Sequence, residues 1–199
     1  MTTSPRLRRI LRFARDRRGV AVIEFAFIAP VLIFFYLGMA ETCQLLMAQR
    51  RVSHAAAALA DLVTQDTTIG NEEVEQLYEA ACTIMRPFPT ADRYRIRLTS
   101  AEFDAAQNRV EVRWSEDNGR GLPSWPVDSV FLAETPLTAN GDGVIIAEIE
   151  YQLVSPIQYF LPGTTRLYHK AEMRPRRSAS VARVAGAAGT STAVKVCSV

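Results

Sequence analysis

A continuous apolar run near the start of the chain constrains its fold more than any other feature. Residues 20–40 make up 21 positions with one charged side chain, Glu24. As an α-helix rising 1.5 Å per residue, the run would extend about 31 Å, the thickness of the hydrocarbon core of a bilayer. A cleaved secretory signal has a shorter apolar stretch with a small-x-small site after it, and the sequence fits neither feature. It therefore predicts a retained transmembrane helix.

Positive charge is concentrated on the N-terminal side of this run. Residues 1–19 contain seven arginines and one aspartate, a net charge of +6, whereas the remaining residues sum to −4 within a total of +2. Arginine clusters beside a span stay on the cytoplasmic side. We therefore expect a cytoplasmic leader at 1–19, a single pass through a bacterial inner membrane at 20–40, and an exported periplasmic domain at 41–199. The arginines expected to set this topology include Arg12, Arg15, Arg17 and Arg18.

A nucleic-acid-binding tail is the alternative interpretation of the arginines, since such runs also neutralise phosphates. The arm adjoins a span and has no aromatic residues interleaved at the spacing of a stacking surface. The sequence therefore favours a role in topology, and no nucleic-acid partner is expected.

Glu24 is the one carboxylate in the apolar run. A charge at the bilayer centre costs about 2.5–3.5 kcal/mol on insertion scales, so such a residue is a functional candidate. Its place five residues into the run also allows a position near the headgroups, where the cost is lower. Position alone leaves both interpretations open.

The residues around Glu24 resemble a type IV prepilin processing site. A basic leader ends in Gly19, and the apolar helix that follows has Glu24 in its fifth position, beside Phe25. The wider stretch is similar to the N-terminal signature of TadE/TadG-like proteins, pseudopilin-like assembly proteins of tight-adherence (Tad) pili, which are Flp or type IVb pili. Residues 141–157 and 167–176 are similar to the C-terminal half of that family.

The resemblance implies roles for individual residues. Gly19 and Val20 would be the scissile pair for a prepilin peptidase, and Glu24 would neutralise the new amino terminus of a neighbouring subunit. Cleavage stays open, because TadG-like members share the glycine and the glutamate, while the modest length favours a TadE-like role. The implied partners are the inner membrane, pilin subunits, other minor pilins, pilus platform proteins and, if the leader is cut, the peptidase.

The rest of the chain predicts an α+β fold. Apolar spacings of three, four and seven extend the first helix to about Gln65, and a second helix begins with Asn71 as its cap and stops at Pro87. Period-two alternation predicts antiparallel strands. They cover 94–98, 109–114, 144–154 as the central strand, 167–173 and a last edge strand at 193–199. The resemblance implies the lollipop shape of a type IV pilin.

The alternation also predicts which strand residues share a face. Val110, Val112 and Trp114 are expected on one side, and Arg95, Arg97 and Glu111 on a charged face open to solvent. The segment 115–143 reads as a long loop, with Trp125 expected to pack on the core. The alternative function, a membrane-tethered periplasmic ligand-binding module, would use this loop for recognition.

Cysteines and histidines give little sign of catalysis. Cys43 is expected to be a buried thiol, and a Cys82–Cys197 disulfide would tie the chain end to the second helix in an oxidising periplasm; two free thiols are the alternative. Two isolated histidines and three dispersed cysteines predict no metal site and no cofactor. Without a catalytic motif, an anchored hydrolase ranks last, and we expect a protein that acts by assembly rather than an enzyme.

Overall fold

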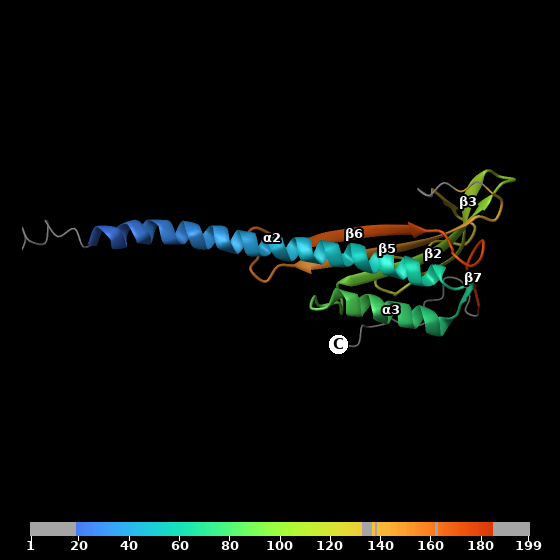
Figure 1. Cartoon of the computed structure of the whole chain (residues 1–199), viewed down its shortest axis with the longest axis horizontal. Helices are drawn as coiled ribbons and strands as arrows, with labels where there is room; N and C mark the ends of the chain where they lie inside the picture. The colour runs from blue at the N-terminus through green and yellow to red at the C-terminus, as the bar shows by residue number, and fades with distance from the viewer. Residues whose placement is uncertain (1–18, 133–136, 138, 162, 185–199) are drawn as a thin grey trace, which may run out of the picture. The chain divides into compact units, whose positions relative to one another are not determined.

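The computed structural model describes residues 19–132, 137, 139–161 and 163–184 (Figure 1). The chain divides into two compact units, Met1–Cys43 and Gln44–Val199. Two α-helices, α2 (Val20–Thr64) and α3 (Asn71–Met85), accompany an antiparallel sheet, so the predicted α+β class with a pilin-like layout is confirmed. The leader and the expected strand at 193–199 lie outside the described residues.

The first unit contributes the N-terminal part of α2, which is apolar on all sides. The helix continues through Pro30 without a break. Its large apolar side chains are exposed around the whole circumference, from Val20 at 48% through Phe27 at 76% to Met39 at 53%. A helix that is hydrophobic all round belongs in a core or a membrane. Among the described residues, α2 is the one helix long and apolar enough to cross a bilayer.

The second unit is built on a five-stranded antiparallel sheet. In spatial order its strands are β4 (Val130–Phe131), β3 (Arg109–Asp117), β2 (Tyr94–Asp104), β5 (Gly143–Val154) and β6 (Thr164–Met173). A separate parallel pair joins β1 (Thr68–Ile69) to β7 (Ala182–Arg183). The strand predicted as central, β5, therefore lies beside the middle strand β2 instead of occupying the middle itself.

The core forms where α3 and the C-terminal part of α2 pack on one face of the sheet. Strands β2 and β5 contribute alternate residues, such as Ile96 and Ile149, which are 1% and 0% exposed. The facing side of α2 is rich in alanine. The alanines Ala48, Ala55, Ala56 and Ala60 are fully buried. Such small side chains let the helix axis approach the strands closely.

The N-cap of helix α3 lies one residue earlier than predicted. The N-cap is Gly70, whose backbone N–H donates to the Glu73 carboxylate at 3.0 Å. The Asn71 side chain instead accepts a hydrogen bond from Arg183 of β7. The local pattern assigned the Asn71 side chain to capping, but this side chain binds Arg183, a residue distant in the sequence.

A β-bulge changes which side chains of β3 lie on the same face of the sheet, compared with the prediction. Trp114 lies opposite Ser100 and Val112 lies opposite Ala101, so Arg113 has no partner in the ladder. An extra residue of this kind inverts the in-out alternation beyond it. Trp114 accordingly belongs to the main core, whereas Val110 packs in a second cluster on the other face. The prediction that these side chains share one face was wrong.

Candidate functional site

The residues assigned by the prepilin resemblance lie at the start of α2. Gly19 is exposed and immediately precedes the helix, and Val20 is its first residue. A Cβ added to Gly19 would meet nothing within 4 Å. The backbone at this junction is therefore accessible. The arginines expected to set the topology, Arg12, Arg15, Arg17 and Arg18, lie outside the described residues.

Glu24 lies one helical turn after Val20 and is exposed. Phe25, Phe27 and Ile28 nearby are 67%, 76% and 55% exposed. The side chain therefore projects from an apolar cylinder, on which a carboxylate is stable in water and costly in hydrocarbon.

The cysteines divide into one free and one bonded among the described residues. Cys43 is free and exposed, which corrects the expectation of a buried thiol. Cys82 on α3 forms a disulfide and packs against the main core. Its predicted partner, Cys197, lies outside the described residues, so the pairing stays a prediction.

The face of the sheet opposite the helices carries buried ion pairs. Arg97 on β2 pairs with Glu148 on β5, and Arg95 and Arg166 both pair with Glu150. Glu148 and Glu150 are 4% and 0% exposed. The expectation of a solvated charged face was therefore wrong at these positions.

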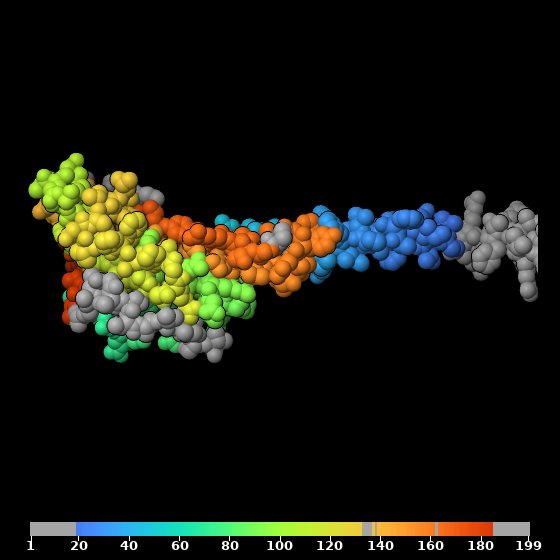
Figure 2. Space-filling view, turned by 180° about the vertical axis from the view of Figure 1, so that it is seen from behind, coloured from blue at the N-terminus to red at the C-terminus, as the bar shows by residue number. Residues whose placement is uncertain are grey.

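The segment between β3 and β4 explains this burial. Figure 2 shows this side of the sheet, where the yellow residues after β3 spread over it. Asn118 holds the segment down, because its side chain accepts from the Ile96 N–H at 3.2 Å and donates to the Tyr94 carbonyl at 3.0 Å. Part of the predicted 115–143 loop is thus a cover for the sheet.

Trp125 lies in this cover and not in the apolar core, where we expected it. It is 37% exposed. Its ring lies 4.8 Å from the Arg97 guanidinium carbon and meets Phe131 edge-on at 6.1 Å. The indole therefore shields the Arg97–Glu148 pair through a cation–π contact.

The environment of Glu148 sets its protonation. Burial alone would raise its pKa, but hydrogen bonds from Arg97 and Tyr168 and the charge of Arg97 outweigh it and lower the pKa. The Tyr168 hydroxyl donates to Oε1 at 2.6 Å. Glu148 is therefore held as a carboxylate, the opposite of what a general acid requires.

A second buried pair joins β7 to the sheet beneath α3. The Arg183 Nε lies 3.1 Å from Glu116 Oε1, and both side chains are almost fully buried. The nearby Tyr78 hydroxyl is buried without a hydrogen-bond partner in the described part of the chain. Burial, followed by the charges of Glu116 and Asp117, raises the pKa of Tyr78. The phenol is thus kept neutral and is no candidate base.

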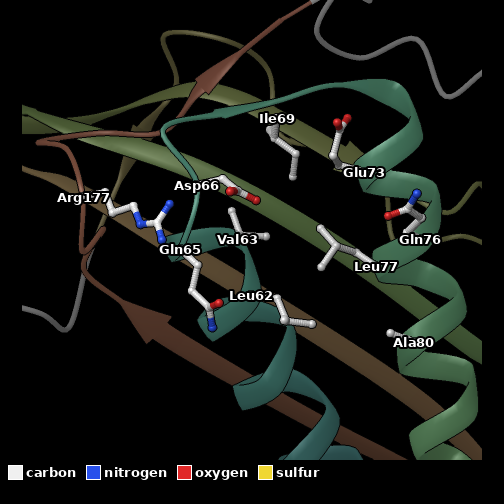
Figure 3. Close-up of a pocket in the computed structure, with 10 residues that line it drawn as sticks. All are labelled: Leu62, Val63, Gln65, Asp66, Ile69, Glu73, Gln76, Leu77, Ala80 and Arg177. Atoms are coloured by element: carbon white, nitrogen blue, oxygen red, sulfur yellow. The ribbon is translucent and has the colours of Figure 1, made fainter.

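Among the described residues of the second unit, the surface is hollowed beside α2 on two sides. One hollow, of about 340 Å³, lies between the end of α2 and α3 (Figure 3), with Leu62 and Leu77 in its wall and Gln65 and Glu73 around it. The other, about 510 Å³, lies between α2 and β6. Within the described residues, no group of three or more His, Cys, Asp or Glu side chains is placed to hold a metal ion.

Glu24 was picked out as the one charge in an apolar run, and Gly19 and Val20 by the prepilin resemblance; their roles stay predictions. Sequence reasoning missed the buried ion pairs, since alternation shows which residues share a face but not what covers that face. The sequence did contain one sign of these ion pairs: basic residues on β2 lie opposite acidic residues on β5.

Comparison with known proteins locates the resemblance on the chain. Neither a curated protein nor a solved structure matches it. The family model "TadE-like protein" matches residues 19–61. This range includes the Gly19–Val20 junction, Glu24 and most of α2. Over these residues the chain is TadE-like.

Proposed function

We propose that this protein is a membrane-anchored, pseudopilin-like component of a Tad/Flp pilus or secretion apparatus that acts by protein–protein assembly and not as an enzyme. The N-terminal part of α2 spans the inner membrane once, the leader is cytoplasmic, and the second unit is periplasmic. Its partners are pilin subunits, other minor pilins and platform proteins. The TadE-like match over residues 19–61 supports this assignment.

One observation carries the proposal: Glu24 is the single charged side chain in the exposed apolar run of α2, residues 20–40. Cleavage after Gly19 would create an α-amino group on Val20. A carboxylate and an ammonium buried together cost less than either charge alone. Glu24 therefore docks the helix against a neighbouring subunit whose amino terminus supplies the positive charge.

The mass of the mature protein tests the processing step. We expect the membrane-extracted chain to begin at Val20, by intact mass and N-terminal sequencing, and a Gly19→Leu variant to keep its leader. A wild-type chain that retains Met1 would remove the pseudopilin mechanism and leave an anchored, TadG-like role.

The role of Glu24 has its own test. Glu24→Ala should abolish piliation while the near-UV circular dichroism of the second unit stays unchanged, and Glu24→Asp should restore part of it. Glu79→Ala, which removes an exposed carboxylate of α3, is the matched control and should leave pili normal. Normal pili in the Glu24→Ala strain would contradict the docking role.

A further inference from the structure

The loop between β5 and β6 presents two aromatic side chains to the outside. Tyr159 and Phe160 are 63% and 44% exposed, and their ring centroids lie 5.5 Å apart. Exposed aromatic pairs of this kind are uncommon on surfaces that face only water, because they leave a large apolar area unburied.

A hydrogen-bonded turn precedes the two aromatic residues. The Ser155 hydroxyl accepts hydrogen bonds from the N–H groups of Ile157 and Gln158, at 3.3 and 3.4 Å. Gln158 then adopts a left-handed backbone conformation, with φ of 53°. A non-glycine residue held in this region marks a turn that the surroundings specify. Tyr159 and Phe160 follow directly after this turn.

Contacts within the second unit fix which end of the sheet carries this loop. Leu46 and Gln49 of α2 line the same hollow as Arg166 and Leu167, near the start of β6. Farther along, the Arg176 N–H, just past the end of β6, donates to the Thr64 carbonyl at 3.0 Å. Helix and strand therefore run in the same direction, and the loop before β6 lies at the end of the unit where α2 enters it.

That end is tied to the apolar run by a very short stretch of chain. The run ends at residue 40 and the second unit begins at Gln44. Four residues reach at most about 14 Å when fully extended. Covalent continuity therefore keeps this end of the unit close to the place where the chain leaves a bilayer, whatever the angle between the two units.

The charge around the loop suits a lipid surface. Residues 155–169 contain no aspartate or glutamate and include Arg166. The Arg166 side chain is 68% exposed, although it also pairs with Glu150, and exposed Arg50 of α2 lines the same hollow. Basic residues beside exposed aromatics match anionic headgroups above an apolar boundary.

We propose that Tyr159 and Phe160 insert into the interface of the bilayer that holds α2, with Arg50 and Arg166 against anionic headgroups, so that the second unit rests on the membrane surface. This inference rests on the membrane anchorage in the proposed function. The tyrosine ring lies in the apolar boundary while its hydroxyl reaches the headgroups, the arrangement that favours aromatic residues at membrane interfaces.

Lipid quenching of tryptophan fluorescence tests the proposal on the full chain. In a Trp125→Phe background, where Trp114 remains as a buried constant, Tyr159→Trp is compared with Leu132→Trp. Leu132 is 89% exposed and follows β4, at the far end of the sheet, about 36 Å from the loop along β5. The proteins are reconstituted in phosphatidylethanolamine–phosphatidylglycerol vesicles with lipids brominated near the headgroup end of the acyl chains.

The expected result is a blue-shifted emission and a loss of fluorescence for Tyr159→Trp, with no loss for Leu132→Trp. Equal quenching of the two variants would overturn the inference. A blue shift without lipid quenching would also overturn it and assign the loop to a protein contact. Flotation of the vesicles separates the two proposals: protein that floats but is not quenched contradicts only the loop insertion, whereas protein that fails to float contradicts the anchorage as well.

Discussion

Arg97 and Glu148 form a two-pronged ion pair across neighbouring strands, with Nε–Oε2 at 2.6 Å and Nη2–Oε1 at 2.7 Å. Arg97 also donates to the Pro123 carbonyl at 2.7 Å, in the segment that covers this face. The pair therefore connects two strands and their cover. Since both side chains are largely buried, loss of one would leave the other without compensation.

Arg97→Ala should lower the free energy of unfolding by about 3–5 kcal/mol, the usual cost of breaking a buried pair from one side. Chemical denaturation of the full chain in detergent, followed by near-UV circular dichroism, measures this. Arg176→Ala is the control, because the side chains of the Arg176–Asp61 pair are 63% and 33% exposed, and should cost less than about 1 kcal/mol. Similar losses of unfolding free energy in the two variants would contradict the greater importance of the buried pair.

Glu148 should also shape the response to acid. Its pKa is lower in the folded chain than in the unfolded one, so it stabilises the fold above the unfolded value of about 4.3. This contribution is lost as pH falls through the lower, folded value. Glu148→Gln should therefore be less stable at pH 7 but lose less stability than the wild type on acidification. Parallel pH profiles would contradict this.

Larger side chains on the buried, alanine-rich side of α2 should destabilise the fold. Ala56→Leu places three more carbon atoms where the helix meets the strands, and we expect a loss of about 1–3 kcal/mol from overpacking. Gln49→Leu adds the same side chain at an exposed position and should change stability by about 0.5 kcal/mol or less. Thermal unfolding of both variants decides the matter; a tolerated Ala56→Leu would show that the interface is loosely packed.

The predicted Cys82–Cys197 bridge can be checked by electrophoresis. Non-reduced wild type should migrate faster than reduced protein, and Cys82→Ser and Cys197→Ser should each abolish the difference, while Cys43→Ser should keep it. The chain-entropy treatment gives a loss of stability of up to about 4–5 kcal/mol for a loop of this length. Retained mobility differences in Cys197→Ser would exclude the pairing.

Much of the fold could be predicted from the periodicity of apolar residues and from residues that end helices. The apolar run and the spacing after it gave α2 almost to its last residue, and Pro87 fixed the end of α3. The strands followed from alternating residues such as Ile96 and Leu98. These signals are local, because each depends on neighbours within one or two turns or along one strand.

The remainder depends on contacts between distant residues. The burial of Arg97 comes from a segment some 25 residues later that folds over the strand. The bulge at Arg113 changes the faces without changing the pattern of residue types. At the candidate site, Glu24 could be identified because its background is uniform, whereas no motif marks the loop around Tyr159, whose position depends on the sheet.

The extra residue at Arg113 has a consequence for how much of the sheet the helices must cover. The longest helical segment on the sheet, residues 44–64 of α2, spans about 31 Å, whereas the 12 residues of β5 span about 40 Å. Strands this much longer than the helix would expose an apolar end if their alternation ran unbroken. By turning Val110 to the other side, the bulge lets the strands extend past the helical layer and bury their far end beneath their own connecting segments.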